Sequence, residues 1–138
     1  MSLNTITIMG MSRVLGYQAE EIASNFLRKK GFKILARNFR TKIGEIDIIA
    51  LKEKRKFFFF KKQSLHFVEV KSGRESFYFF PEFKVNSRKR KKIAQVAEIW
   101  LSQNKKLKTL PIQIDVLSLI FDKEQKLKEI TYFENVAL

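Results

Sequence analysis

Apolar residues recur at helical spacing in two long segments of the chain. From Arg13 to Lys30 they fall every three to four positions, and Gly31 follows where a glycine often ends a helix. From Ser87 to Gln103 a second apolar stripe follows a basic first turn, and it consists of Ile93, Val96, Ala97, Trp100 and Leu101. The pattern predicts two amphipathic helices, each with one buried face.

Shorter apolar runs bounded by turn residues predict strands. We expect them at residues 32–40, 46–51, 65–71, 112–121 and 130–133. Residues 52–64 are expected to form an enlarged hairpin arm, and residues 72–85 an irregular segment. The order helix, three strands, helix, two strands predicts a mixed sheet flanked by helices, of the α/β or α+β type.

Length and composition predict the domain organisation and the location. A chain of 138 residues is the size of one globular domain, which we place at residues 13–138, with residues 1–12 as an N-terminal extension. No apolar run approaches the roughly 18 residues of a membrane span, so no integral membrane association is expected. The absence of cysteine excludes disulfides, thiolate nucleophiles and Cys-based zinc sites, and it fits a cytoplasmic protein.

The charge of the chain points to a polyanionic partner. Lys and Arg number 28 against 14 Asp and Glu, which gives a formal net charge of +14. The basic residues that we expect to contact nucleic acid form two groups: Lys54, Arg55 and Lys56 on the hairpin arm, and Arg88, Lys89, Arg90, Lys91 and Lys92 at the start of the second helix. Each run alone is typical of a solvated face, whereas both together with a carboxylate site are typical of phosphate contacts.

The four phenylalanines Phe57–Phe60 interrupt the basic arm. Such a run is more typical of a buried strand or a partner surface than of a platform that stacks bases. From the sequence we therefore favour a buried strand or a partner surface.

Charged residues inside two of the strands indicate possible chemistry. Asp47 lies in one strand, and Glu69 and Lys71 lie on one face of the next, so the two carboxylates converge if the strands pair. Two such carboxylates suit Mg²⁺ or Mn²⁺, and the neighbouring ammonium suits phosphoryl chemistry. The alternative, with equal weight, is structural ion pairing of Glu69 with Lys71 and of Asp47 with Lys42 or Arg40.

The strand faces and the histidine count narrow this interpretation. Alternation places Glu45, Asp47 and Ile49 on one face and Ile46, Ile48 and Ala50 on the other. The single histidine, His66, weighs against a Ser/His/Asp site or a histidine-bound zinc. A site made of carboxylates and a hard cation remains as the candidate type of active site.

Three further polar residues are weaker candidates or have a structural interpretation. Glu20 lies beside Ala19 on the apolar stripe of the first helix, where it either faces the sheet or is solvated. Asp115 is a carboxylate within a strand, and we favour a structural pairing with a basic residue. Gln95, one turn beyond the basic helix start, is a weaker candidate for a polar contribution.

The ordered set of motifs resembles a known family. An acidic residue followed about twenty residues later by Glu69-Val70-Lys71 resembles the PD-(D/E)xK core of the restriction-endonuclease-like nucleases, which include archaeal Holliday junction resolvases. More closely, the chain is similar to the YraN-like family of small uncharacterised bacterial proteins. The matching positions include Gly16, Ala19-Glu20, Arg37 to Arg40, Gly44 to Ala50, Phe67 to Lys71, Lys89 and Ile114-Asp115-Val116.

The resemblance implies a fold, a cofactor and roles for matched residues. It implies a restriction-endonuclease-like α/β fold with Asp47 and Glu69 as metal ligands, Lys71 as the catalytic lysine and Glu20 as a further acidic residue. The departures from the family pattern are Ser72 to Arg74 after the lysine, the aromatic run Phe77 to Phe80, Gln113 in place of an arginine, and the arm Lys52 to Ser64. These changes affect the expected DNA-contacting surface rather than the metal site.

Three functions follow as hypotheses. The first is a Mg²⁺- or Mn²⁺-dependent endonuclease that hydrolyses phosphodiesters of duplex or branched DNA, for which a homodimer would suit a symmetric junction. The second is a non-catalytic nucleic-acid-binding module with the same fold. The third is a basic protein-interaction domain that displays Phe57–Phe60.

Overall fold

The computed structural model describes residues 2–74 and 87–136. Its elements, in chain order, are α1 (Ser2–Lys29), β1 (Phe32–Arg40), β2 (Glu45–Lys56), β3 (Phe60–Arg74), α2 (Ser87–Gln103), the short 3₁₀ helix η1 (Lys105–Leu107), β4 (Ile112–Phe121) and β5 (Leu127–Phe133). In this part of the chain, neither helix is long and apolar enough to cross a membrane.

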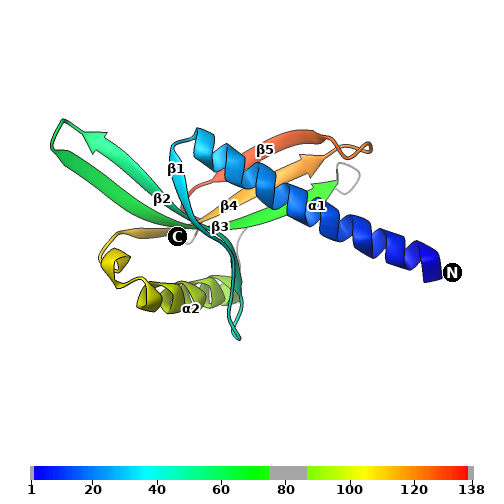
Figure 1. Ribbon diagram of the computed structural model, residues 1–138, viewed down its shortest axis with the longest axis horizontal. Coiled ribbons are helices and arrows are strands. Elements are labelled where there is room, and N and C mark those ends of the chain that lie inside the picture. The colour runs from blue at the N-terminus through cyan, green and yellow to red at the C-terminus, as the bar shows by residue number, and fades with distance from the viewer. Residues whose placement is uncertain (1, 75–86, 137–138) are drawn as a thin grey trace.

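The strands form one mixed sheet in the order β1-β2-β3-β4-β5. Neighbouring strands are antiparallel except β3 and β4, which are parallel and are connected through the segment that contains α2. Figure 1 shows α1 on one side of the sheet and α2 on the other. The α/β fold predicted from the sequence is confirmed, and it is consistent with a restriction-endonuclease-like architecture.

Each helix covers a separate apolar core. Ala19, Ala23 and Leu27 of α1 lie over one face of the sheet, where they pack with side chains that include Val68 and Leu117. All five predicted stripe residues of α2 are buried against the opposite face. The 3.6-residue period of the apolar positions therefore gave the buried face of both helices correctly.

The boundaries differ from prediction mainly where strands continue into polar sequence. The bounds of α2 and β4 are as predicted, whereas α1 begins at Ser2 instead of Arg13. The enlarged hairpin arm expected at residues 52–64 is confirmed, because β2 continues to Lys56 and pairs with β3 as far as Phe60. Of the segment predicted to be irregular, residues 72–74 belong to β3, and the rest lies outside the described residues.

The phenylalanine run is not a buried strand, contrary to one of the two favoured interpretations. Phe57, Phe58 and Phe59 form the turn between β2 and β3, and Phe60 begins β3. All four side chains are exposed. Among the described residues, the hairpin beyond Lys52 and Ser64 consists of two strands and pairs with no third strand.

The predicted alternation of faces along β2 is wrong at one position. Ile46 packs with Ile49 in the cluster beneath α2, whereas Ile48 and Ala50 pack in the cluster beneath α1. The change of face occurs at Asp47, which has no partner in the otherwise regular pairing of β1 with this part of β2. Asn38 of β1, opposite this position, has a φ of 50°, so the local backbone is not a regular pleat.

Candidate metal and phosphate site

Asp47 lies at the point where β2 separates from β3. The pairing of the two strands begins at Ile48 and Val68, so Asp47 is one residue beyond the last pair. Its Oδ2 accepts a hydrogen bond of 2.8 Å from the backbone N–H of Val70. The carboxylate thus replaces a backbone acceptor at the point where the ladder ends, and this contact fixes its orientation toward β3.

Glu69 lies beside Asp47, and its two oxygens have different surroundings. Its Oε1 forms an ion pair with Lys89 of α2. Its Oε2 is buried and has no hydrogen-bond partner among the described residues. A buried carboxylate oxygen without a donor is costly to maintain, so this atom is a natural ligand position for a cation.

A pocket of about 340 Å³ separates the end of the β2–β3 pairing from α2. Asp47 and Glu69 line it from the sheet, together with Glu45, and Lys89 and Lys92 line it from the helix. The two lysines are three residues apart, so they share the helix face that continues into the buried residues of α2. The pocket therefore combines carboxylates on its sheet side with ammonium groups on its helix side.

Lys71 extends this charged group along β3. It is not one of the pocket-lining residues, but burial and the positive charge of Lys89 lower its pKa below the ordinary value of 10.5, and the charge of Glu69 opposes that shift. Lys71 lies two residues from Glu69 and so belongs to the same face of the strand. A lysine with a lowered pKa beside carboxylates is typical of functional sites.

Burial raises the pKa of Asp47 from 3.8 to about 6. The hydrogen bond from Val70 opposes this rise, whereas the negative charges of Glu69, Glu20 and Glu45 add to it. An ionised carboxylate near other carboxylates would be stabilised by a cation, because the cation offsets both the burial and the repulsion.

The raised pKa has a measurable effect on stability. A carboxyl group whose pKa rises on folding contributes stability that is complete below its unfolded pKa and is lost as the pH rises through the folded value. We therefore expect Asp47→Asn, which stays neutral, to raise the free energy of unfolding by about 1 to 3 kcal/mol near neutral pH. The gain is expected to disappear near pH 4, in urea unfolding measured across this range.

A matched control separates this effect from a general loss of negative charge. Glu98→Gln removes an exposed carboxylate of α2 and is expected to change the free energy of unfolding by less than about 0.5 kcal/mol. A gain from Asp47→Asn that is equal at all pH values would contradict the assignment.

Glu20 approaches this group from the opposite helix without lining the pocket. Its Oε2 accepts a hydrogen bond of 2.7 Å from the side chain of Asn38, and its charge contributes to the raised pKa of Asp47. The structure thus places Glu20 in the electrostatic surroundings of Asp47. Its participation in catalysis stays a prediction.

The two basic groups predicted to contact nucleic acid lie at different places. At the helix start, Lys89 and Lys92 line the pocket, Arg88 and Lys91 are exposed, and Arg90 is partly buried. The hairpin group of Lys54, Arg55 and Lys56 lies at the far end of β2. At about 3.3 Å per residue, that end is roughly 30 Å from Asp47. Gln95 of α2 is exposed and does not line the pocket.

The ion pairs predicted as the structural alternative are formed differently. Glu69 forms an ion pair with Lys89, and Arg40 pairs with Glu45 at 3.3 Å. Glu45 and Lys89 both line the pocket, and the sequence did not predict their ion pairs with Arg40 and Glu69. The only signal for Glu45 is its position two residues before Asp47 in the same strand.

The residues fit a magnesium-type ion with few protein ligands. Over residues 2–74 and 87–136, no group of three or more His, Cys, Asp and Glu side chains is arranged to hold a metal. Mg²⁺ commonly uses one or two carboxylates and completes its shell with water and substrate phosphate. Asp47 and the unsatisfied Oε2 of Glu69 match that smaller requirement.

Comparison with known proteins gives a family. The model of the uncharacterised protein family UPF0102 matches residues 19–119, which is most of the chain and includes Asp47, Glu69 and Lys71. The chain belongs to the UPF0102 family. A UPF0102 protein of Petrotoga mobilis is 45% identical over 103 residues, covering 75% of this chain and 83% of the relative. A UPF0102 protein of Wolinella succinogenes is 39% identical over 128 residues, covering 93% and 100%.

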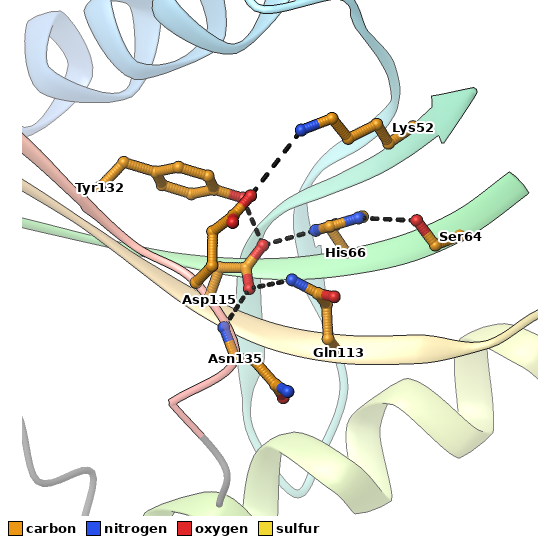
Figure 2. Close-up of polar contacts among 8 residues, drawn as sticks. Lys52, Ser64, His66, Gln113, Asp115, Tyr132 and Asn135 are labelled. Carbon is orange, nitrogen blue, oxygen red and sulfur yellow. Dashed lines mark hydrogen bonds and ion pairs between the residues drawn. The ribbon is translucent and has the colours of Figure 1, made fainter. Parts of the chain in front are cut away.

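This UPF0102 protein also has a buried polar cluster that the sequence only partly indicated. Figure 2 shows four groups converging on Asp115, which is fully buried. His66 Nδ1 and the Tyr132 hydroxyl donate to Oδ2, and Gln113 Nε2 and the backbone N–H of Asn135 donate to Oδ1. These hydrogen bonds outweigh the effect of burial and hold the pKa of Asp115 below 3.8.

The expected structural role of Asp115 agrees with this geometry, although only one of its partners is a basic residue. The cluster joins β3, β4, β5 and the segment after β5. Ser64 lies 2.9 Å from His66 Nε2, so the UPF0102 chain does place a serine, a histidine and an aspartate in series. The imidazole is 3% exposed and packs edge-on against Phe32, and Asp115 is committed to two further donors, so we assign the series to the core.

Proposed function

We propose that this protein is a Mg²⁺- or Mn²⁺-dependent endodeoxyribonuclease. The observation that carries the proposal is that Asp47 and Glu69 line one pocket bordered by lysines, while Oε2 of Glu69 has no hydrogen-bond partner among the described residues. The raised pKa of Asp47, about 6, supports it. Structural ion pairs alone do not require an orphaned carboxylate oxygen. The resemblance to nucleases with a D…(D/E)-x-K core supports the same assignment, and branched DNA is the substrate class it implies.

Each charged group has a role in this proposal. Asp47, held by the N–H of Val70, and Glu69 would hold the ion, which would supply charge neutralisation of the phosphate and activation of a water. Lys71 is placed to orient the attacking water or to stabilise negative charge on the phosphate. Lys89 and Lys92 contact the phosphodiester backbone, which positions DNA without reading its sequence.

The ion pair of Lys89 with Glu69 is compatible with the proposed metal site. In the absence of a cation, the ammonium group compensates the charge of Glu69. With a divalent cation held by Glu69, this contact would be weakened, and Lys89 would lie beside the phosphate of a bound DNA. Neutralisation of Glu69 by Lys89 is also the observation that favours the second candidate, a nucleic-acid-binding module without turnover.

A cleavage panel tests the proposal against this second candidate. Linear duplex, flapped and four-way DNA are incubated with the protein and Mg²⁺ or Mn²⁺, and parallel reactions contain a chelator. The proposal expects metal-dependent cleavage of at least one substrate and none in the chelator. Salt-dependent binding of every substrate without cleavage under either metal would establish the binding module instead.

A further inference from the structure

The tip of the β2–β3 hairpin is an exposed aromatic surface that projects from the sheet. Phe57, Phe58, Phe59 and Phe60 are 88%, 102%, 90% and 73% exposed, and Figure 1 shows the hairpin extending beyond the other strands. Exposure of four neighbouring aromatic rings is unfavourable in water and marks an interaction site.

The backbone of the turn does not explain the choice of phenylalanine. Phe57 has a φ of 61°, in the left-handed region where glycine or asparagine is favoured and a bulky side chain is strained. A turn selected only for folding would carry one of those residues. The aromatic ring is therefore retained at a cost to the hairpin.

The basic side chains next to the tip also destabilise the hairpin, because like charges face each other across its two strands. The cross-strand pairs are Lys54 with Lys62 and Arg55 with Lys61, so cations face cations on a two-stranded ribbon. Like charges directly opposite each other destabilise a hairpin. Glu53 compensates part of this charge, with Arg55 at 3.8 Å and Lys61 at 3.4 Å. A polyanionic partner would offset the remaining repulsion.

Rings and cations border the same hollow. Arg55, Phe57, Phe58 and Lys61 line a depression of about 420 Å³ at the tip. An aromatic face beside two cations matches a nucleotide, since the base stacks on the ring and the phosphate is held by the cations. A base within a duplex has both faces covered by its neighbours, so an unpaired base is the form that fits.

We propose that the hairpin tip binds unpaired nucleotides of single-stranded DNA. This inference rests on the proposed function and specifies its substrate class: duplex DNA with a single-stranded tail, gap or branch. The tip and Asp47 are separated by roughly 30 Å along β2, which corresponds to about nine base pairs at 3.4 Å each. The unpaired segment and the cleaved bond are accordingly about nine base pairs apart.

The test measures binding in a chelator, so that it is independent of cleavage. Fluorescence anisotropy with labelled oligo(dT) and with a blunt duplex of equal length compares the wild-type chain with Phe57→Asn/Phe58→Ser. Asparagine accepts the left-handed turn, so the fold is preserved while both rings of the hollow are lost. We expect the affinity for oligo(dT) to fall by about 10-fold or more and the affinity for duplex to change by less than about twofold.

The matched control is Phe59→Ser/Phe60→Ser, which removes two exposed rings that do not line the hollow. It is expected to weaken oligo(dT) binding by less than about threefold. Equal losses for oligo(dT) and duplex, or no loss in the hollow variant, would overturn the inference. So would ring-dependent sedimentation with vesicles of phosphatidylcholine and phosphatidylglycerol in the absence of ring-dependent oligo(dT) binding, because the tip would then be a membrane contact.

The failures of the two proposals are distinguishable. Ring-dependent oligo(dT) binding without metal-dependent cleavage of any substrate would remove the nuclease and keep the nucleotide contact. Cleavage by the wild-type chain that is equally fast in Phe57→Asn/Phe58→Ser on tailed and blunt duplexes would keep the nuclease and remove the contact.

Discussion

Replacement of Glu69 by glutamine is expected to lower the rate of metal-dependent DNA cleavage by about 10³-fold. The substitution keeps the size of the side chain and removes the negative charge that holds the ion. Loss of the cation removes several kcal/mol of charge stabilisation, and each 1.36 kcal/mol corresponds to a tenfold change in rate. The measurement is the single-turnover rate on the best substrate of the panel, beside the affinity for Mn²⁺ from calorimetry.

Lys71→Ala is expected to lower the cleavage rate without lowering the metal affinity, in contrast to Glu69→Gln. We expect cleavage to fall by about 10² to 10³-fold while Mn²⁺ affinity is kept, because Lys71 lies near Glu69 but is not a ligand. Lys106→Ala, at an exposed lysine of η1, is the control for loss of positive charge and is expected to cleave at the wild-type rate. Folded Glu69→Gln protein with full activity would end the nuclease proposal.

Asp115→Asn is expected to cause the largest loss of stability. The new amide group would direct a donor at His66 or Tyr132, or at Gln113 and the N–H of Asn135, all of which now donate to the carboxylate. Breaking a buried charged network costs about 3 kcal/mol or more. For a chain of this size the melting temperature falls by roughly 10 °C, as measured by calorimetry.

The dependence on pH gives this prediction a second readout. Because folding lowers the pKa of Asp115, its contribution is present above the unfolded pKa and is lost as the pH falls through the folded value. The destabilisation caused by Asp115→Asn should therefore shrink in acid. The stabilisation expected from Asp47→Asn disappears in acid too, but it has the opposite sign. Glu124→Gln, on the exposed turn, should change stability by less than about 0.5 kcal/mol. Equal stability of Asp115→Asn at neutral pH would contradict the structural role.

Amphipathic elements were predicted most accurately. The buried face of α2 and the bounds of β4 follow from the spacing of their apolar residues, because burial of those residues drives both helix and strand packing. Polar stretches were predicted less well. The hairpin arm was expected, but β5 begins at Leu127 instead of residue 130 and β3 continues to Arg74. Both extensions depend on hydrogen bonds to β4, and backbone pairing leaves no hydrophobic pattern in the sequence.

The candidate site shows a similar division. The sequence placed Asp47, Glu69 and Lys71 on neighbouring strands, and antiparallel pairing from Ile48 and Val68 onward brings these segments together. It did not predict that Asp47 turns toward Val70 where the strands separate, because strict alternation assumes an unbroken ladder. The roles assigned to these residues stay predictions.

The sequence by itself determined the α/β order of elements, the buried faces of the helices and the presence of carboxylates inside strands, since these depend on local spacing and residue type. Only the tertiary structure decided which charges meet. The pairing of Glu69 with Lys89, the four donors around Asp115 and the exposure of Phe57–Phe60 all depend on segments distant in the chain or on the ends of a ladder. Contacts of that kind depend on strand register and helix docking, and neither is encoded in any single stretch of residues.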